Sequence, residues 1–489
     1  MATWPPQPLL YEINTWVWLG ELVQRYGRPL TLAEVPDEEW DAIAGWGFDA
    51  VWLMGVWERS PLGRDIAMSD AALVASFRNA LPDYRPDDNA GSPYCVHRYV
   101  VDPHLGGPAG LTGARAALAA RGVRLVLDFV PNHVAPDHPW VYDHPEYFIH
   151  GTEADLAGAP LEYLRAGESI IARGRDPFFP PWLDVLQLNV FDPGMRIVVV
   201  DTLCEVAAQC DGLRCDMAML VTNRIFARTW GERAGQAPPT EYWTEVIDAV
   251  RAMYPGTLFL AEAYWDLEWE LQRLGFDYCY DKRLCDRLAS DGAPSVLAHL
   301  HAPIEYQSRL VRFIENHDER RAASAFAPAQ ARAAAVVFAT LPGAKLFHEG
   351  QLEGRRARLP VFLARRVPES PDSELRDFYH QLLASVTGGA SRAGTWQLIE
   401  PEGWPDNGSF ENLVAWCWAG DAQREIVVVN LSNESAEGRV RLPWHDLAGA
   451  KWTLTDRIDG SVYPRDGIEL LAPGLFVKLP PWGYHFLAF

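Results

Sequence analysis

The sequence has too little positive charge for a protein that binds polyanions. Against 65 Asp and Glu residues it holds only 43 Lys and Arg, which gives a formal net charge of −22 at pH 7. Binding to DNA or RNA depends on basic side chains that neutralise phosphates. Docking on an anionic membrane surface depends on basic clusters in the same way. The charge balance therefore argues against both nucleic acid and membrane as partners.

Long apolar runs and paired cysteines are also lacking. The longest uncharged apolar run, 333–344, is far shorter than the roughly 20 residues of a membrane-spanning helix. Residues 1–6 have neither the basic region nor the apolar core of a secretory signal. Seven cysteines are an odd number without a pairing pattern, which is typical of reduced thiols. We therefore expect a cytoplasmic protein.

Apolar and aromatic residues, by contrast, are plentiful. The hydrophobic fraction is 48% and the charged fraction 22%, which is ordinary for a globular protein with a large core. Trp and Phe are equally frequent at 20 each, and Tyr adds 17. Flat aromatic rings suit sugar rings, but they also fill protein cores. The composition alone leaves both interpretations open.

Eight short apolar runs, most of them ending in polar residues, recur along the first 350 residues. Continuous runs of this length are typical of strands that are buried on both faces of a parallel sheet. Amphipathic helical patterns lie between several of them, as at Leu203, Val206, Ala207 and Cys210. This alternation predicts an α/β protein built on a (β/α)8 TIM barrel. The runs are 9–14, 50–55, 123–128, 212–216, 258–262, 276–280, 310–315 and 344–348.

Two regions depart from the barrel pattern. About 80 residues separate the third and fourth runs, whereas one barrel unit needs about 30. We interpret 134–186, which is rich in His, Pro, Asp and aromatic residues, as a subdomain inserted on the catalytic rim. After residue 390 the chain shows only short strand-like runs punctuated by Gly, Pro and Asn, which predicts a C-terminal antiparallel β-sandwich over 391–489. The barrel itself is predicted to comprise 1–133 and 187–390.

Acidic side chains follow three of the predicted strands. Because strand ends of a barrel converge on one pocket, we expect Asp216, Glu262 and Asp318 to be neighbours. Arg214 lies two residues before Asp216, on the same side of its strand, and should keep that carboxylate ionised. Glu262 is expected to lie farther from the guanidinium and to retain a proton. An ionised and a protonated carboxyl about 5 Å apart are what retaining glycoside cleavage requires.

Four segments, in this order, resemble the conserved motifs of glycoside hydrolase family 13, the α-amylase superfamily. They are 128–133, 212–216, Glu262 with its strand, and 316–318; the short segment 187–189 resembles a further motif. The resemblance covers nearly the whole chain. It implies that Asp216 is the nucleophile, that Glu262 is the acid/base, and that Asp318 holds the ring hydroxyls of the cleaved sugar. It also implies sugar-binding or orienting roles for Tyr94, His133, Arg214 and His317.

The sequence departs from the family after the nucleophile. Members that act on long α-glucans often carry Lys-His where this chain has Met219 and Leu220, which favours short substrates. Asn132 matches a position that often binds calcium, but the six to eight oxygens that the ion needs are not evident, so we expect no required cofactor. Asp128 is expected to be structural. The four histidines at 133, 138, 144 and 150 have no zinc-ligand spacing.

Three functions remain open from the sequence. The favoured one is a retaining α-glycosidase that hydrolyses short α-linked glucosides or oligosaccharides. A transglycosylase, sugar isomerase or phosphorylase would use the same covalent intermediate with a different acceptor. A non-catalytic carbohydrate-binding or scaffold barrel would have no need of Asp216, Glu262, Asp318 and Arg214 together.

Overall fold

A closed barrel of eight parallel strands forms the centre of the molecule. The computed structural model describes residues 3–421 and 423–489. Neighbouring barrel strands follow the chain order, and β1 closes the barrel against both β2 and β14. The predicted barrel is confirmed, with each strand on one of the eight apolar runs. The strands are β1 (Leu9–Asn14), β2 (Ala50–Met54), β5 (Arg124–Phe129), β10 (Gly212–Cys215), β11 (Leu258–Ala261), β12 (Tyr278–Tyr280), β13 (Leu310–Arg312) and β14 (Ala344–His348).

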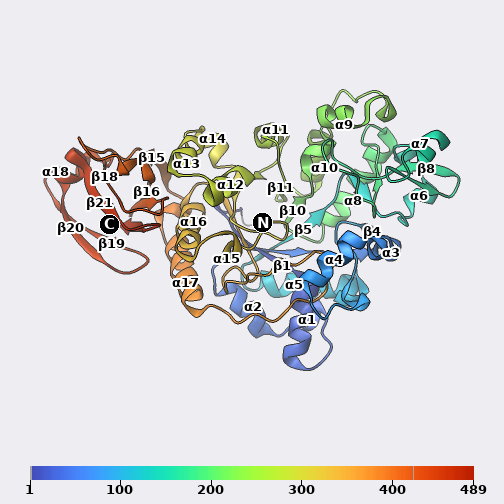
Figure 1. The fold of residues 1–489 in the computed structure, drawn as a ribbon, viewed down its shortest axis with the longest axis horizontal. Helices are drawn as coiled ribbons and strands as arrows, with labels where there is room; N and C mark the ends of the chain where they lie inside the picture. Colours follow the sequence, from blue (N-terminus) through green and yellow to red (C-terminus); the bar gives the residue numbers. More distant parts are fainter. Residues whose placement is uncertain (1–2, 422) are drawn as a thin grey trace.

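Helices surround this barrel because alternate strand residues point outward and need apolar cover. A separate set of side chains fills the interior, including Leu10, Trp52 and Leu346. Trp4 packs against this interior core at one end and Tyr94 at the other. Figure 1 shows the helices around the strands. They include α1 (Thr15–Tyr26), α2 (Asp37–Ala44), α5 (Gly107–Ala119), α8 (Pro193–Ala207), α10 (Tyr242–Met253), α12 (Lys282–Ser290), α13 (Ala293–Leu300), α16 (Pro328–Thr340) and α17 (Ser373–Thr387).

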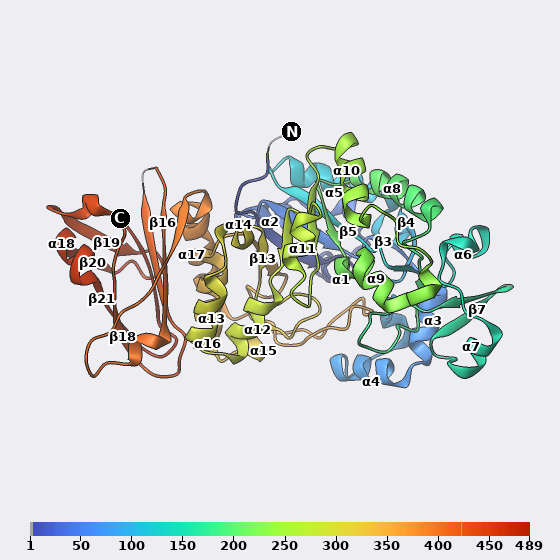
Figure 2. The ribbon, with the colours of Figure 1, turned by 90° about the horizontal axis from the view of Figure 1, so that it is seen from above.

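The excursion between β5 and β10 lies at the end of the molecule opposite the C-terminal domain (Figure 2). Its first and last strands pair with each other in antiparallel fashion, with His133 opposite Gln187. The excursion therefore leaves and rejoins the barrel at one point on the rim. Its elements are β6 (His133–Val134), α6 (Trp140–Asp143), α7 (Glu153–Gly158), β7 (Tyr163–Ala166), β8 (Ser169–Ala172) and β9 (Leu186–Gln187).

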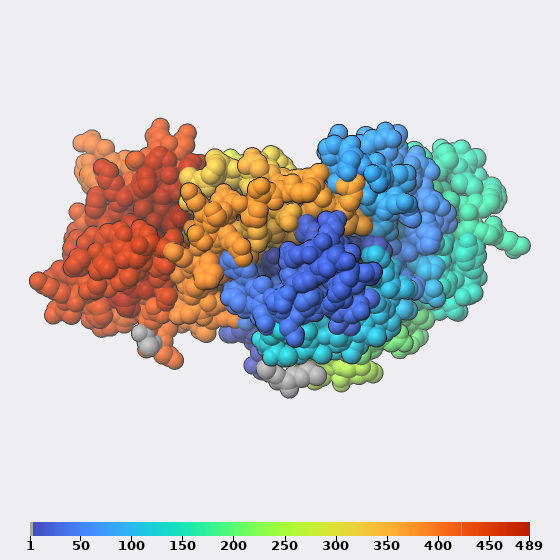
Figure 3. All heavy atoms as spheres, turned by 90° about the horizontal axis from the view of Figure 1, so that it is seen from below, coloured from blue at the N-terminus to red at the C-terminus, as the bar shows by residue number. Residues whose placement is uncertain are grey.

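A second excursion, between β2 and β5, was not predicted. Its elements are β3 (Trp57–Arg59), α3 (Pro61–Ser69), α4 (Ala71–Ala80) and β4 (Val96–Val101). It meets the loop after β14 through a bidentate ion pair between Asp88 and Arg365 and a hydrogen bond from Ala90 N to Phe362 O of 2.8 Å. Figure 3 shows this orange loop against the light-blue segment. The two segments together build one wall of the rim.

The C-terminal domain is an antiparallel sandwich, as predicted. One face of its larger sheet packs on α16 and α17 through residues such as Trp416, Trp418 and Val427. The other face packs on the two-stranded sheet of β18 (Ala436–Val440) and β21 (Leu475–Leu479). Within the described residues, no helix combines the length and apolar character needed to cross a membrane. The larger sheet has the order β15 (Thr395–Ile399), β16 (Leu413–Ala419), β17 (Arg424–Asn430), β22 (Tyr484–Ala488), β19 (Lys451–Asp456) and β20 (Val462–Asp466).

Candidate active site

The predicted carboxylates gather at the carboxyl ends of the barrel strands. Asp216 and Glu262 each directly follow a strand and remain tied to its neighbour by backbone hydrogen bonds. Asp216 N donates to Phe129 O at 2.8 Å, and Glu262 N donates to Cys215 O at 3.0 Å. With Asp318 they line a cavity of about 350 Å³. The structure therefore brings all three predicted acids into one pocket.

Arg214 lies beneath this pocket and contacts both proposed reacting groups. Its Nη1 is 2.6 Å from Asp216 Oδ1, and its Nη2 is 2.8 Å from Glu262 Oε2. The guanidinium is fully buried and is also packed against the rings of Tyr94 and Trp52. The expectation that Glu262 lies farther from this cation is wrong: one buried guanidinium serves both carboxylates.

Burial sets the protonation of the two carboxyls. Burial is the largest influence on the pKa of Glu262, which is raised to about 7. The charges of Asp216 and Asp318 also act to raise this pKa, whereas Arg214 acts to lower it. Burial also raises the pKa of Asp216, again opposed by Arg214. A pKa near neutrality makes Glu262 the carboxyl able to hold a proton at neutral pH. The predicted division of roles thus remains, but it does not rest on distance from Arg214.

His317 connects Asp318 to a buried acid that the sequence analysis did not single out. Its Nδ1 bonds to Glu12 Oε1, while its Nε2 lies 2.7 Å from Tyr94 Oη and 2.9 Å from Asp318 Oδ2. Although burial acts against it, the two carboxylates hold the pKa of His317 well above its usual range. The pKa of Asp318 is in turn lowered to about 2, because His317 and Arg214 outweigh burial. Asp318 is therefore an ionised acceptor facing the cavity.

The remaining predicted residues also lie at or beside the pocket. His133 lines the cavity, and burial lowers its pKa to about 4, so the ring is neutral. Asp128 accepts hydrogen bonds from Trp52 Nε1 and Gly55 N rather than facing the cavity, as expected of a structural residue. Met219 and Leu220 are buried.

Asn132 forms a reciprocal amide pair with Gln187. Gln187 Nε2 donates to Asn132 Oδ1 at 2.9 Å, and Asn132 Nδ2 donates to Gln187 Oε1 at 3.2 Å. Elsewhere in the described part of the chain, no cluster of three or more His, Cys, Asp or Glu side chains is arranged to hold a metal ion. The side-chain amide of Asn132 is therefore engaged in hydrogen bonds with Gln187.

Loops contribute further cavity residues that the sequence did not predict to bind sugar. Trp182 lines the cavity and packs on His133, with ring centroids 5.2 Å apart. Trp243, by contrast, is fully buried and donates to Ala218 O. Tyr264 and Phe362 reach the cavity from loops whose positions depend on the assembled fold. The full lining is Ser92, Tyr94, His133, Trp182, Asp184, Val185, Asp216, Met217, Glu262, Tyr264, Asp318 and Phe362.

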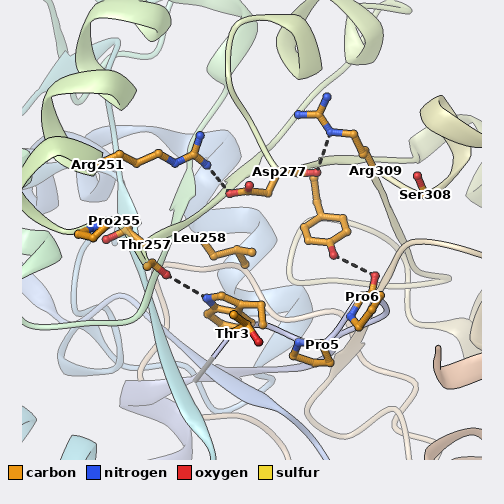
Figure 4. Close-up of a pocket in the computed structure, with 13 residues that line it drawn as sticks. Thr3, Pro5, Pro6, Arg251, Pro255, Thr257, Leu258, Asp277, Ser308 and Arg309 are labelled. Carbon is orange, nitrogen blue, oxygen red and sulfur yellow. Dashed lines mark hydrogen bonds and ion pairs between the residues drawn. The ribbon is translucent and has the colours of Figure 1, made fainter. Parts of the chain in front are cut away.

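A larger cavity, about 820 Å³, lies at the opposite end of the barrel (Figure 4). The N-terminal segment and the starts of β11 and β12 line it. Its charged groups are already paired: Arg251 bonds to Asp277, and Arg309 donates to backbone carbonyls. Strand starts of such barrels serve stability, whereas strand ends carry chemistry. The smaller cavity at the strand ends is therefore the candidate active site.

No family model matches the chain. In sequence it is 23% identical over 439 residues to alpha-amylase MalA of Haloarcula japonica, which covers 88% of this chain and 56% of that protein. It is 27% identical over 214 residues to an alpha-1,4-glucan:maltose-1-phosphate maltosyltransferase of Burkholderia pseudomallei, which covers 42% of this chain and 16% of that protein. The chain thus spans about half the length of the first relative and a smaller part of the second.

The fold is shared with solved structures along its whole length. The noncanonic maltogenic alpha-amylase AmyB from Thermotoga neapolitana superimposes with a TM-score of 0.69 at 16% identity, and the match covers 99% of each chain. At this identity the likeness establishes a common fold.

Proposed function

We propose that this chain, which has the sequence motifs and the fold of the α-amylase superfamily, is a retaining α-glycosidase. It would hydrolyse α-glucosidic bonds of short α-glucosides or oligosaccharides. The observation that carries the proposal is the single guanidinium of Arg214, which holds Asp216 and Glu262 within 2.8 Å of its two terminal nitrogens at the edge of one cavity. A shared guanidinium brings the two carboxyls near each other, and retention requires a shorter separation between them than inversion does.

In the first step, Asp216 attacks the anomeric carbon while Glu262 donates its proton to the departing glycosidic oxygen. The C–O bond breaks with its electron pair on that oxygen, and a glycosyl ester forms on Asp216. Glu262, now ionised, then accepts a proton from water as the water attacks the ester and releases Asp216. Arg214 stabilises the negative charge that moves between the two carboxyls.

The cavity supports a small substrate. At about 350 Å³ it lies near the lower end of ligand pockets. Asp318 and Tyr94 offer polar contacts, and Trp182 offers an aromatic face. A second cavity of about 660 Å³ adjoins it and shares Asp318 and Phe362, which leaves room for a further sugar unit. We therefore propose di- and oligosaccharides rather than polymeric starch as substrates.

Transfer is the second candidate function. The curated relatives include proteins named as maltosyltransferases, which supports an acceptor other than water. A transglycosylase, isomerase or phosphorylase would share every step up to the glycosyl ester. A carbohydrate-binding scaffold without activity is disfavoured, because it would not need three carboxyls and a guanidinium buried together.

We also propose a cytoplasmic location. All seven cysteines are free, and six of them are buried. Unpaired thiols in this number are typical of proteins from a reducing compartment.

Substitution of the nucleophile tests the proposal. We expect Asp216→Asn to lower turnover of maltose or maltotriose by about 10⁴-fold or more, because the covalent step is lost. The matched control is Asp201→Asn on the exposed face of α8, which should leave turnover unchanged. In the wild type, 5-fluoro-α-glucosyl fluoride should leave a glycosyl adduct on the peptide that contains Asp216, detected by mass spectrometry. Full activity of Asp216→Asn, or an adduct elsewhere, would contradict the mechanism.

The products separate hydrolysis from transfer. The wild type would be incubated with maltose, sucrose, trehalose and maltooligosaccharides, and products followed by ¹H NMR. Free glucose that first appears as the α-anomer indicates retaining hydrolysis. Rearranged or elongated sugars, or a sugar phosphate formed only with added phosphate, indicate transfer.

A further inference from the structure

The two carboxyl oxygens of Glu262 have different neighbours. Oε2 accepts a hydrogen bond from Met217 N at 2.7 Å and lies 2.8 Å from Arg214 Nη2. Oε1 instead lies 2.9 Å from the hydroxyl of Tyr264. One oxygen therefore faces fixed donors, and the other faces a group that can both donate and accept.

The donors at Oε2 are held rigidly. Met217 adopts a left-handed backbone conformation with φ 41° and ψ 46°, which is uncommon for a residue with a long side chain. This conformation directs its N–H to Oε2, and the following N–H of Ala218 donates to Glu262 O at 3.1 Å. A proton on Oε2 would face an N–H group and a guanidinium at hydrogen-bond distance. The transferable proton of Glu262 therefore belongs on Oε1.

We propose that Tyr264 is a positioning residue for the acid/base, and that its hydroxyl holds the transferable proton of Glu262 at Oε1. When Glu262 is protonated, the hydroxyl accepts from Oε1–H; after proton transfer, it rotates and donates to the ionised Oε1. In that transfer the Oε1–H bond breaks and a new O–H bond forms on the glycosidic oxygen, while Tyr264 keeps its own proton. The inference rests on the proposed function.

Tyr264 differs from the other groups that act on Glu262. Burial holds its pKa well above the usual range, so it remains a neutral phenol with one proton to direct. Within the described residues, its hydroxyl supplies the hydrogen bond that reaches Oε1. The charged and titratable groups facing Glu262 are Arg214 and Asp216 of the β10 end, Asp318 after β13, Tyr280 of β12 and Tyr264 of its own loop.

Tyr264→Phe tests this role because it removes the hydroxyl and keeps the ring. We expect kcat on maltose to fall about 10-fold, since the ionised acid loses a donor. Turnover of α-glucosyl fluoride should change less than about 2-fold, because fluoride leaves without a proton. The alkaline limb of the pH–rate profile on maltose should move to higher pH, since loss of a donor to the carboxylate raises the pKa of Glu262. The matched control is Tyr242→Phe, whose buried hydroxyl has no hydrogen-bond partner among the residues that the structure describes.

Equal losses on both substrates, or an unmoved alkaline limb, would overturn the inference and leave only a packing role for Tyr264. A ¹³C NMR titration of the Glu262 carboxyl gives a readout that needs no turnover. A higher titration midpoint in Tyr264→Phe than in wild type supports the inference, and an unchanged midpoint overturns it. If the wild type turns over neither substrate, the proposed function fails separately, and the titration still decides the role of Tyr264.

Discussion

One residue, Arg214, links structure and chemistry at the candidate site. A fully buried guanidinium is costly unless anions surround it. Here Asp216, Glu262 and Asp128 all lie within 3.5 Å of its terminal nitrogens. The same contacts that stabilise the cation also fix where the carboxyls lie. The positions of the proposed nucleophile and the proposed acid are therefore a condition of folding as well as of the proposed chemistry.

The pH dependence follows from Glu262. Because its pKa is about 7 and the acid must be protonated, kcat/KM on maltose should decline as pH rises through about 7. Assays from pH 4 to pH 9 measure this limb. Glu262→Gln should lower kcat/KM by about 10²–10⁴-fold and remove the limb. A rate that still rises above pH 8 in the wild type would contradict the assignment of Glu262.

The site acids that could be predicted lie after apolar strands, Asp216 and Glu262 directly and Asp318 six residues beyond β13, whereas Tyr94 and His133 rested on the family resemblance. Asp216, Glu262 and Asp318 stood out because a charge at the end of a buried run is costly unless it has a role. Glu12 is likewise a charged residue in a buried apolar run. Because it lies inside the first run rather than at its end, it was taken only as part of a strand. Tyr264 and Trp182 lie in loops, and no periodicity places a loop residue in a cavity.

At the scale of elements, we expect the buried ion pair before α12 to have a large effect on stability. Asp281 caps this helix by accepting from Leu284 N and pairs with the buried side chains of Arg312 and His299. Arg312 is fully buried. Loss of Asp281 would leave its guanidinium without this counter-charge inside the protein.

We expect Asp281→Asn to lower the free energy of unfolding by about 3–5 kcal/mol at pH 7, measured by urea denaturation. The control is Asp286→Asn, whose pair with Lys282 is solvent-exposed and should contribute less than about 1 kcal/mol. Arg312 and His299 outweigh burial and lower the pKa of Asp281 to about 2. Its contribution is complete above the unfolded pKa near 4 and is lost as pH falls towards 2. An equal effect of both variants would contradict this account.

All eight barrel strands lie on apolar runs because both faces of each strand are buried. In the C-terminal domain β15, β20 and β22 were not predicted. β15 and β20 have side chains that alternate with solvent, and β20 contains Pro464. The excursion between β2 and β5 was missed because its helices are short and do not share a long apolar stripe.

For the whole molecule, the barrel and the C-terminal domain share one core. Trp418 of β16 is buried, and its Nε1 donates to Thr340 O at the end of α16 at 2.7 Å. Figures 1 and 2 both show α16 and α17 between the barrel and the sandwich. Burial across this contact should make the two parts unfold together.

We therefore expect a single transition in calorimetry of the full chain. Trp418→Ala should lower stability by about 3–5 kcal/mol and shift that transition as a whole, because it opens a cavity between the two parts. Trp404→Ala, at a half-exposed position of the same domain, should cost less than about 1 kcal/mol. Two transitions, with only one shifted by Trp418→Ala, would show instead that the parts are independent.

Closure of the barrel by β1 and β14 has a consequence during synthesis. Glu12 is synthesised 305 residues before its partner His317. A nascent chain therefore carries an acid destined for full burial without its counter-ion until His317 has been made. Because β1 also needs β14 as a neighbour, an interrupted message yields no fragment with a complete pocket.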